Sequence, residues 1–200
     1  MKLINKQKNR NFKLSNSGFT IIETMVAVFI LTTSLAALLN LTASSAVTAR
    51  YSRNEIIANY LLQEAVDFIR NDRDTIAFQG NVDGSGWSNF KSTYSSCFFD
   101  AGCIIEPIKG NSSIQSCLNS TSGINGCPLL KYSDNLAENR GFYSYEGTTN
   151  SVFRRQIKMY NNADNPEDEI DIVVTLEWQN GGVTRSRTLN SSLLNWQVNY

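Results

Sequence analysis

Apolar residues fill one continuous run early in the chain. Residues 19–39 contain a single ionisable side chain, Glu23, and as a helix they would be about 31 Å long. This length matches the hydrocarbon thickness of a bilayer, so the run predicts a membrane-spanning helix. A charged side chain costs roughly 2.5–3.5 kcal/mol at the centre of such a segment and less towards its end. Glu23 should therefore have a partner and a task.

The apolar pattern becomes amphipathic over residues 40–74. Between Val47 and Phe68, apolar positions recur at steps of three and four, which is typical of a helix with one buried face. No glycine or proline occurs from residue 19 to residue 74, so nothing in the sequence breaks the helix before that point. The two patterns together predict one helix, roughly 80 Å long, that ends near Asp72.

Residues 141–200 alternate between apolar and polar positions, as half-buried strands do. The alternation is clearest over residues 170–178 and is also present over residues 151–160. Residues 180–182, Asn-Gly-Gly, predict a hairpin turn in which either Asn-Gly or Gly-Gly holds the tight positions. With a short aromatic strand at residues 142–145, we expect an antiparallel sheet of three or four strands. Packed on the second half of the helix, this sheet gives an α+β fold.

The net charge is zero, but the basic and acidic side chains are distributed unevenly along the chain. Residues 1–18 hold five basic side chains and no acidic one, whereas the rest of the chain holds 13 basic and 18 acidic side chains. A basic flank beside an apolar run places that end in the cytoplasm. We therefore expect a single-pass membrane protein whose C-terminal part is exported. The acidic balance of this part gives no reason to expect nucleic-acid binding.

Residues 75–140 are rich in Gly, Ser and Asn, which predicts connected loops with short strands. Four cysteines lie here, and an even number in an exported segment favours two disulfides. Of the three possible connectivities we favour Cys97–Cys103 with Cys117–Cys127, because each closes a short loop in a region with little core of its own. A structural zinc site is the alternative, but the spacing lacks the closely spaced cysteine pairs of zinc ribbons.

A small residue, Gly18, stands directly before the apolar run that Phe19 begins. Cleavage between these two residues would create an amine at Phe19, at the same membrane depth as Glu23. The segment Gly18-Phe-Thr-Ile-Ile-Glu23 resembles the processing site of type IV prepilins and of the pseudopilins of type II secretion. The resemblance implies that a prepilin peptidase removes residues 1–18 as a leader and that Phe19 is then methylated.

The resemblance also implies where the chain resides and what it contacts. Such proteins are held in the bacterial cytoplasmic membrane before assembly, and their helices then pack with other pilins into a filament. Glu23 would accept the methylated amine of a neighbouring subunit in this helical bundle. The implied fold is pilin-like, with the long helix packed on the small sheet.

One departure from the family pattern concerns the type of pilin. Many major pilins carry a helix-kinking proline in the membrane helix, and here Asn40 stands in that neighbourhood. Together with the long cysteine-bearing segment, this departure favours a minor pilin or a pseudopilin.

Two other readings explain the same N-terminal residues. Thr20 and Glu23 match a capping box, in which the two side chains satisfy free N–H groups at a helix start. On that reading the chain is an exported binding domain held by a single transmembrane anchor. On the other, it is a soluble secreted domain cut near Ala46, where small residues follow the apolar run.

Little in the sequence indicates catalysis. The chain has no histidine, the commonest general base and metal ligand, and it has no phosphate-binding loop, nucleophile elbow or zinc-protease motif. The acidic segment at residues 164–171 could attract calcium, but it lacks the alternation and the glycine of an EF-hand loop. We therefore expect a structural protein without a metal or cofactor, and not an enzyme.

Overall fold

The computed structural model describes residues 18–79, 85–107, 114–118, 120–133 and 141–196. The leader predicted at residues 1–18 lies outside the described residues except for Gly18. The chain divides into two compact units, residues 1–48 and residues 49–200.

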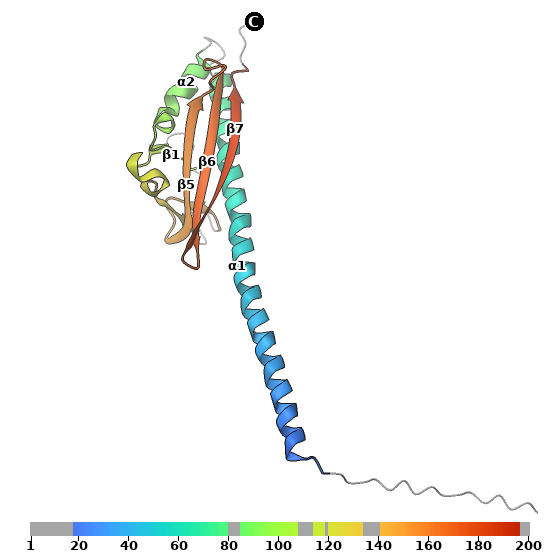
Figure 1. Ribbon diagram of the computed structural model, residues 1–200. Coiled ribbons are helices and arrows are strands. Elements are labelled where there is room, and N and C mark those ends of the chain that lie inside the picture. Colours follow the sequence, from blue (N-terminus) through green and yellow to red (C-terminus); the bar gives the residue numbers. More distant parts are fainter. Residues whose placement is uncertain (1–17, 80–84, 108–113, 119, 134–140, 197–200) are drawn as a thin grey trace, which may run out of the picture. The chain divides into compact units, whose positions relative to one another are not determined.

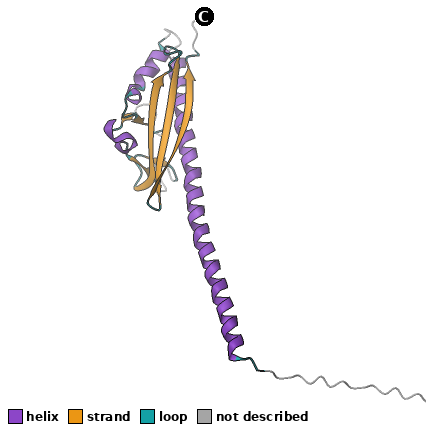
Figure 2. Ribbon diagram, viewed as in Figure 1, coloured by secondary structure: helices purple, strands orange, loops and turns teal. Residues whose placement is uncertain are grey.

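Helix α1 (Ile21–Gln79) is the longest element (Figures 1 and 2). It continues past the end predicted near Asp72, because no glycine or proline intervenes before Gly80 and the buried stripe goes on through Ile76 and Ala77.

In the first unit, every described residue of α1 is exposed. The helix contains an 18-residue window with a mean hydropathy of 2.1, and it is the one helix among the described residues that is long and apolar enough to cross a membrane. Its hydroxyl side chains donate hydrogen bonds to carbonyls of their own helix, at Thr24, Thr32, Thr33 and Ser34. These bonds satisfy the donors that lipid could not.

The second unit is built on three long antiparallel strands, β5 (Thr149–Asn161), β6 (Glu169–Asn180) and β7 (Val183–Leu194). Strand β6 pairs with both neighbours in continuous register. Every second residue of β6 is buried, which confirms the predicted alternation; these residues are Ile170, Ile172, Val174, Leu176 and Trp178.

The turn between β6 and β7 has the Gly-Gly form. Asn180 pairs with Val183 across the turn, and Gly181 and Gly182 have φ angles of 60° and 82°. Positive φ at both central residues is what a tight hairpin turn of this kind requires, and glycine adopts it without steric cost.

Four shorter strands complete the sheet: β1 (Cys103–Ile104), β2 (Gln115–Ser116), β3 (Leu129–Tyr132) and β4 (Tyr143–Ser144). Strand β5 pairs with β1 and β3 as well as with β6, whereas β7 pairs only with β6 among the described strands. The seven strands exceed the three or four expected, because β1 to β3 are too short to show an alternation in the sequence.

Short helices occupy much of the segment between α1 and β3. They are α2 (Gly86–Thr93) and the 3-10 helices η2 (Ser95–Phe98) and η4 (Ser120–Gly126). The structure contains the two favoured disulfides, Cys97–Cys103, which joins η2 to β1, and Cys117–Cys127. No cysteine is free.

The core of the second unit lies between the inner face of the sheet and the second half of α1 (Figure 2). Burial of a large apolar side chain stabilises a fold by about 1.5–3 kcal/mol, so this contact dominates the stability of the unit. The helix contributes Ala58, Leu61, Leu62, Ala65, Val66, Ile69 and Ile76, and the long strands contribute Phe153, Ile157, Met159, Leu193 and the five buried residues of β6.

Candidate processing and assembly site

The predicted processing site occupies the start of α1, where Gly18, Phe19 and Thr20 precede the helix. The Thr20 carbonyl accepts backbone hydrogen bonds from Glu23 at 3.1 Å and from Thr24 at 3.2 Å. The Thr20 Oγ1 accepts a longer bond from the Glu23 N–H, at 3.4 Å. Threonine is a preferred capping residue for this reason, and the bonds explain where the helix begins.

The Glu23 carboxylate takes no part in this cap. In a full capping box, the glutamate side chain accepts a hydrogen bond from the backbone N–H of the capping residue. Among the hydrogen bonds of the described residues, none joins the Glu23 carboxylate to the Thr20 N–H. The carboxylate is exposed, so the capping-box reading does not by itself explain why Glu23 is present.

The peptide bond between Gly18 and Phe19 lies in an open, exposed part of the chain. Phe19 is 79% exposed, and a Cβ atom added to Gly18 would meet nothing within 4 Å. Packing among the described residues therefore does not require glycine at position 18.

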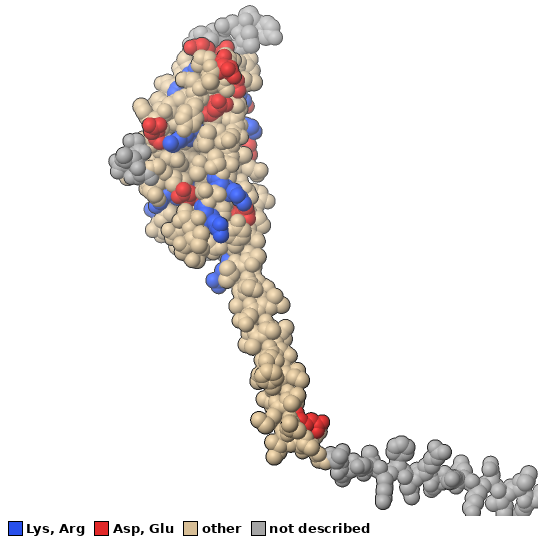
Figure 3. All heavy atoms as spheres, viewed as in Figure 1, with Lys and Arg blue, Asp and Glu red and all other residues tan. Residues whose placement is uncertain are grey.

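The described part of the first unit presents an apolar surface with a single charge. Glu23 is its only ionisable residue, and Figure 3 shows acidic atoms only near the start of the helix in this part of the chain. Each large apolar side chain from Phe19 to Val47 that the surface presents is more than half exposed. Such a surface needs lipid or other apolar helices to cover it.

Arg155 lies at the centre of a buried network in the second unit. Its Nη1 donates hydrogen bonds to the Leu61 carbonyl at 2.9 Å and to the Glu64 carboxylate at 2.8 Å, and its Nη2 donates to the Ile105 carbonyl at 3.2 Å. The side chain is wholly buried. The sequence analysis missed this residue, although a period of two places position 155 on the same face of β5 as Phe153.

Two buried carboxyl groups belong to the same unit. Burial raises the pKa of Asp72, and a hydrogen bond of 2.8 Å from the Tyr94 hydroxyl partly offsets this. Burial also raises the pKa of Glu106, whose Oε2 accepts the backbone N–H of Tyr145 at 2.6 Å. Their contacts are structural, and the described residues contain no group of three or more potential metal-ligating side chains.

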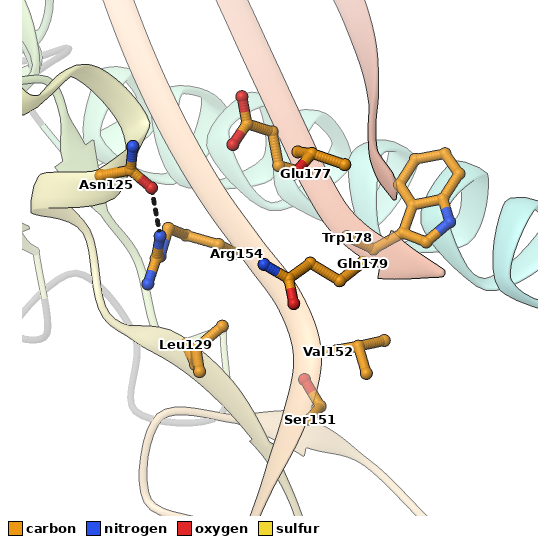
Figure 4. A pocket seen from close by; sticks show the side chains of 9 residues that line it. Asn125, Leu129, Ser151, Val152, Arg154, Glu177, Trp178 and Gln179 are labelled. Carbon is orange, nitrogen blue, oxygen red and sulfur yellow. Dashed lines mark hydrogen bonds between the residues drawn. The ribbon is translucent and has the colours of Figure 1, made fainter. Parts of the chain in front are cut away.

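The outer face of the sheet carries a depression of about 250 Å³ near the turn between β6 and β7 (Figure 4). Arg154 Nη1 donates a hydrogen bond of 2.6 Å to Asn125 Oδ1 there, and Glu177 and Gln179 line it from β6. Ser151 also lines it.

Comparison with known proteins bears on the N-terminal residues. The family described as the prokaryotic N-terminal methylation motif matches residues 13–39, which include Gly18, Phe19 and Glu23. No curated protein and no solved structure matches the chain.

Proposed function

Because the motif at residues 13–39 is the signature of type IV pilins and pseudopilins, we propose that this chain is a structural subunit of a type IV pilus or of a type II secretion-like filament. The single observation that carries the proposal is this motif, set at the start of a helix whose exposed apolar surface needs other helices or lipid.

Processing occurs at the bond between Gly18 and Phe19. A prepilin peptidase removes residues 1–18, and the new N-terminal amine of Phe19 is methylated. The exposed, open environment of this bond supports the assignment, because a protease needs an accessible chain.

Glu23 pairs with the methylated amine of Phe19 on a neighbouring subunit. The pairing cancels two charges inside a bundle of apolar helices, where either charge alone would be costly. The carboxylate is available for this role, because it is not engaged in the cap of its own helix.

Before assembly, residues 19–39 cross the cytoplasmic membrane with the N-terminus in the cytoplasm, and residues 49–200 are exported. The disulfides Cys97–Cys103 and Cys117–Cys127 fit an oxidising compartment. Within the family we assign the chain to the minor pilins or pseudopilins, since Asn40 stands where a kinking proline would mark a major pilin.

The test is the intact mass and the N-terminal residue of the protein isolated from its native membrane. We expect a chain that starts at Phe19 and carries about 14 Da for one added methyl group. A start near Val47 would identify a secreted domain, and an intact Met1 would identify an anchored binding domain. Either result would overturn the proposal.

A further inference from the structure

The second unit carries an excess of negative charge at one end of its sheet. Five carboxylates follow one another in the connection between β5 and β6 and in the first residues of β6, and we call them the acidic end: Asp164, Glu167, Asp168, Glu169 and Asp171. Within the described residues, none of them forms an ion pair. Their side-chain hydrogen-bond partners are neutral, such as Asn195 on Asp168 and Ser192 on Asp171.

The cations nearest to this end leave the excess in place. Arg70 is paired with Asp67, and Arg73 with Asp74, so each is matched by a carboxylate of its own helix. Lys91 donates to the backbone carbonyls of Pro166 and Glu167, so its charge offsets one of the five carboxylates and a negative excess remains.

The opposite end of the sheet carries an excess of positive charge. Five cations, which we call the basic end, gather around the turn between β6 and β7 and the adjoining part of α1: Arg50, Arg53, Lys131, Arg154 and Arg185. The Arg185 guanidinium lies 5.7 Å from the ring centre of Tyr51, which joins the hairpin to the helix at this end. Glu177 lies opposite Arg154 in the paired strands β5 and β6 and offsets one of the five charges, which leaves a positive excess at this end.

The two ends are well separated. Strand β6 runs from Glu169 at the acidic end to Asn180 beside the basic end, a distance of about 36 Å for an extended strand. Figure 3 shows a gathering of acidic atoms at the upper end of the unit, and basic atoms with some acidic atoms among them in its lower half. The charges of this unit are thus arranged as a dipole along its strands.

We propose that copies of this chain associate end to end, with the acidic end of one copy against the basic end of the next. The inference rests on the proposed function. Copies in a filament are related by a helical operation, so they face the same way and must meet through two different surfaces. Opposite charges on those surfaces attract in this arrangement and repel in the reversed one, which gives the contact its polarity.

A membrane surface is the other partner that would attract the basic end, because anionic lipid head groups attract clusters of arginine and lysine. Lipid would explain the basic end alone and would leave the acidic end without a role. A second copy of the chain accounts for both ends.

The first experiment tests the contact by cross-linking the full chain in native membranes. Ser52→Cys lies at the basic end and Ala163→Cys at the acidic end, and both positions are exposed. With a short bismaleimide reagent, the double variant should give a ladder of dimers, trimers and larger species, whereas neither single variant should. Cross-links only to proteins of other mass would overturn a contact between copies.

The second experiment reverses the charges in the double-cysteine chain. Asp164→Lys with Glu167→Lys, or Arg50→Glu with Arg53→Glu, should each reduce the ladder at least roughly tenfold, and the four changes together should restore it. Restoration cannot come from damage to the fold. Asp100→Lys, exposed and at neither end, is the control and should leave the ladder unchanged.

Two outcomes of the reversal would overturn the proposal. One is a cross-linked ladder that persists after each charge reversal, or that does not return when all four changes are combined. The other is a loss only for the arginine reversal, together with lost binding to anionic vesicles, which would assign the basic end to lipid. The N-terminal mass of the same samples separates this inference from the proposed function: methylated Phe19 without a ladder refutes only the end-to-end contact.

Discussion

Gly102 lies close against the backbone of β5 in the second unit. Its φ angle is +67°, and a Cβ atom added to it would lie 2.6 Å from the carbonyl oxygen of Ile157. Its carbonyl also accepts the backbone N–H of Cys117 at 3.0 Å. This residue therefore holds both cysteine-bearing loops against β5, and only glycine fits.

We expect Gly102→Ala to lower the free energy of unfolding by about 3 kcal/mol, because the substitution adds both backbone strain and a backbone clash. Gly181→Ala is the matched control: its φ is +60°, and its added Cβ meets nothing within 4 Å. The control should lose only about 1 kcal/mol. Urea unfolding of the full chain in detergent measures both, and equal losses would contradict the role of the close approach.

The buried pair of Asp72 and Tyr94 makes stability depend on pH. Since burial raises the pKa of Asp72 in the folded chain, the folded state binds the proton more tightly than the unfolded state does. The contribution to stability is then fully present below the ordinary carboxyl pKa, about 3.9. It is lost as the pH rises through the raised value.

Asp72→Asn should flatten this part of the pH dependence, because the amide keeps an acceptor for the Tyr94 hydroxyl but cannot ionise. The measurement is the free energy of unfolding from urea titrations at a series of pH values between about 3 and 7. Asp164→Asn, at an exposed position, serves as the control and should keep the wild-type slope. An unchanged slope in Asp72→Asn would refute the assignment.

At the scale of elements, Arg155 joins three parts of the second unit. Its hydrogen bonds reach α1 at Leu61 and Glu64 and reach Ile105, while its backbone belongs to β5. A second ion pair, between Glu55 of α1 and Arg187 of β7, joins the helix to the sheet at a more exposed position. The two pairs therefore connect similar elements with very different access to water.

Arg155→Met should lower the free energy of unfolding by about 3–5 kcal/mol, because it leaves buried acceptors without their donor. Arg187→Met removes the exposed pair and should cost clearly less, since water replaces the lost partner. Chemical unfolding compares the two variants. A loss in Arg187→Met as large as that in Arg155→Met would show that burial does not determine the difference.

The sequence predicts an element well when its apolar residues repeat with a regular period. Strand β6 was predictable because one of its faces is buried along its whole length, and α1 because its apolar stripe repeats over many turns. Helix α2 and strands β1 to β3 were not predictable, since they are too short for a repeat of apolar residues to appear. Arg155 occupies a position of β5 at which the alternation predicts an apolar residue. Its hydrogen-bond partners are 50 to 94 residues away in the chain.

The candidate processing site stays a prediction, and the sequence could supply it because Gly18, Phe19 and Glu23 are close together in the chain. The structure adds that the junction is accessible and that Glu23 is not used by the helix cap. The partner of Glu23 belongs to another molecule, and no pattern within one chain specifies it.

At the scale of the whole molecule, a substitution of Glu23 can distinguish an effect on processing from an effect on assembly. On the proposed function, Glu23→Gln should leave cleavage after Gly18 and methylation of Phe19 intact, since the proposed cleavage site lies four residues before Glu23. Incorporation into filaments should fall at least roughly tenfold, because the amine of the neighbouring subunit would be buried without a counter-charge. Mass spectrometry reports the first effect, and the amount of subunit in sheared filaments reports the second.

Thr24→Val provides the control for this prediction. The Thr24 hydroxyl bonds only to the Ile21 carbonyl of its own helix, at 2.7 Å, so its loss should leave incorporation near the wild-type level. Normal recruitment of Glu23→Gln would eliminate the charge pairing between subunits.

The placement of the disulfides has a mechanical consequence. They join cysteines that are 6 and 10 positions apart in the sequence, and neither joins α1 to β6 or β7. A tensile load that enters through α1 and leaves through β7 is therefore resisted by non-covalent contacts alone, such as those of Arg70 with Ser191 and of Arg73 with the Leu194 carbonyl. Once these contacts rupture, nearly the whole unit is free to extend, and each residue released lengthens the chain by about 3.3–3.6 Å.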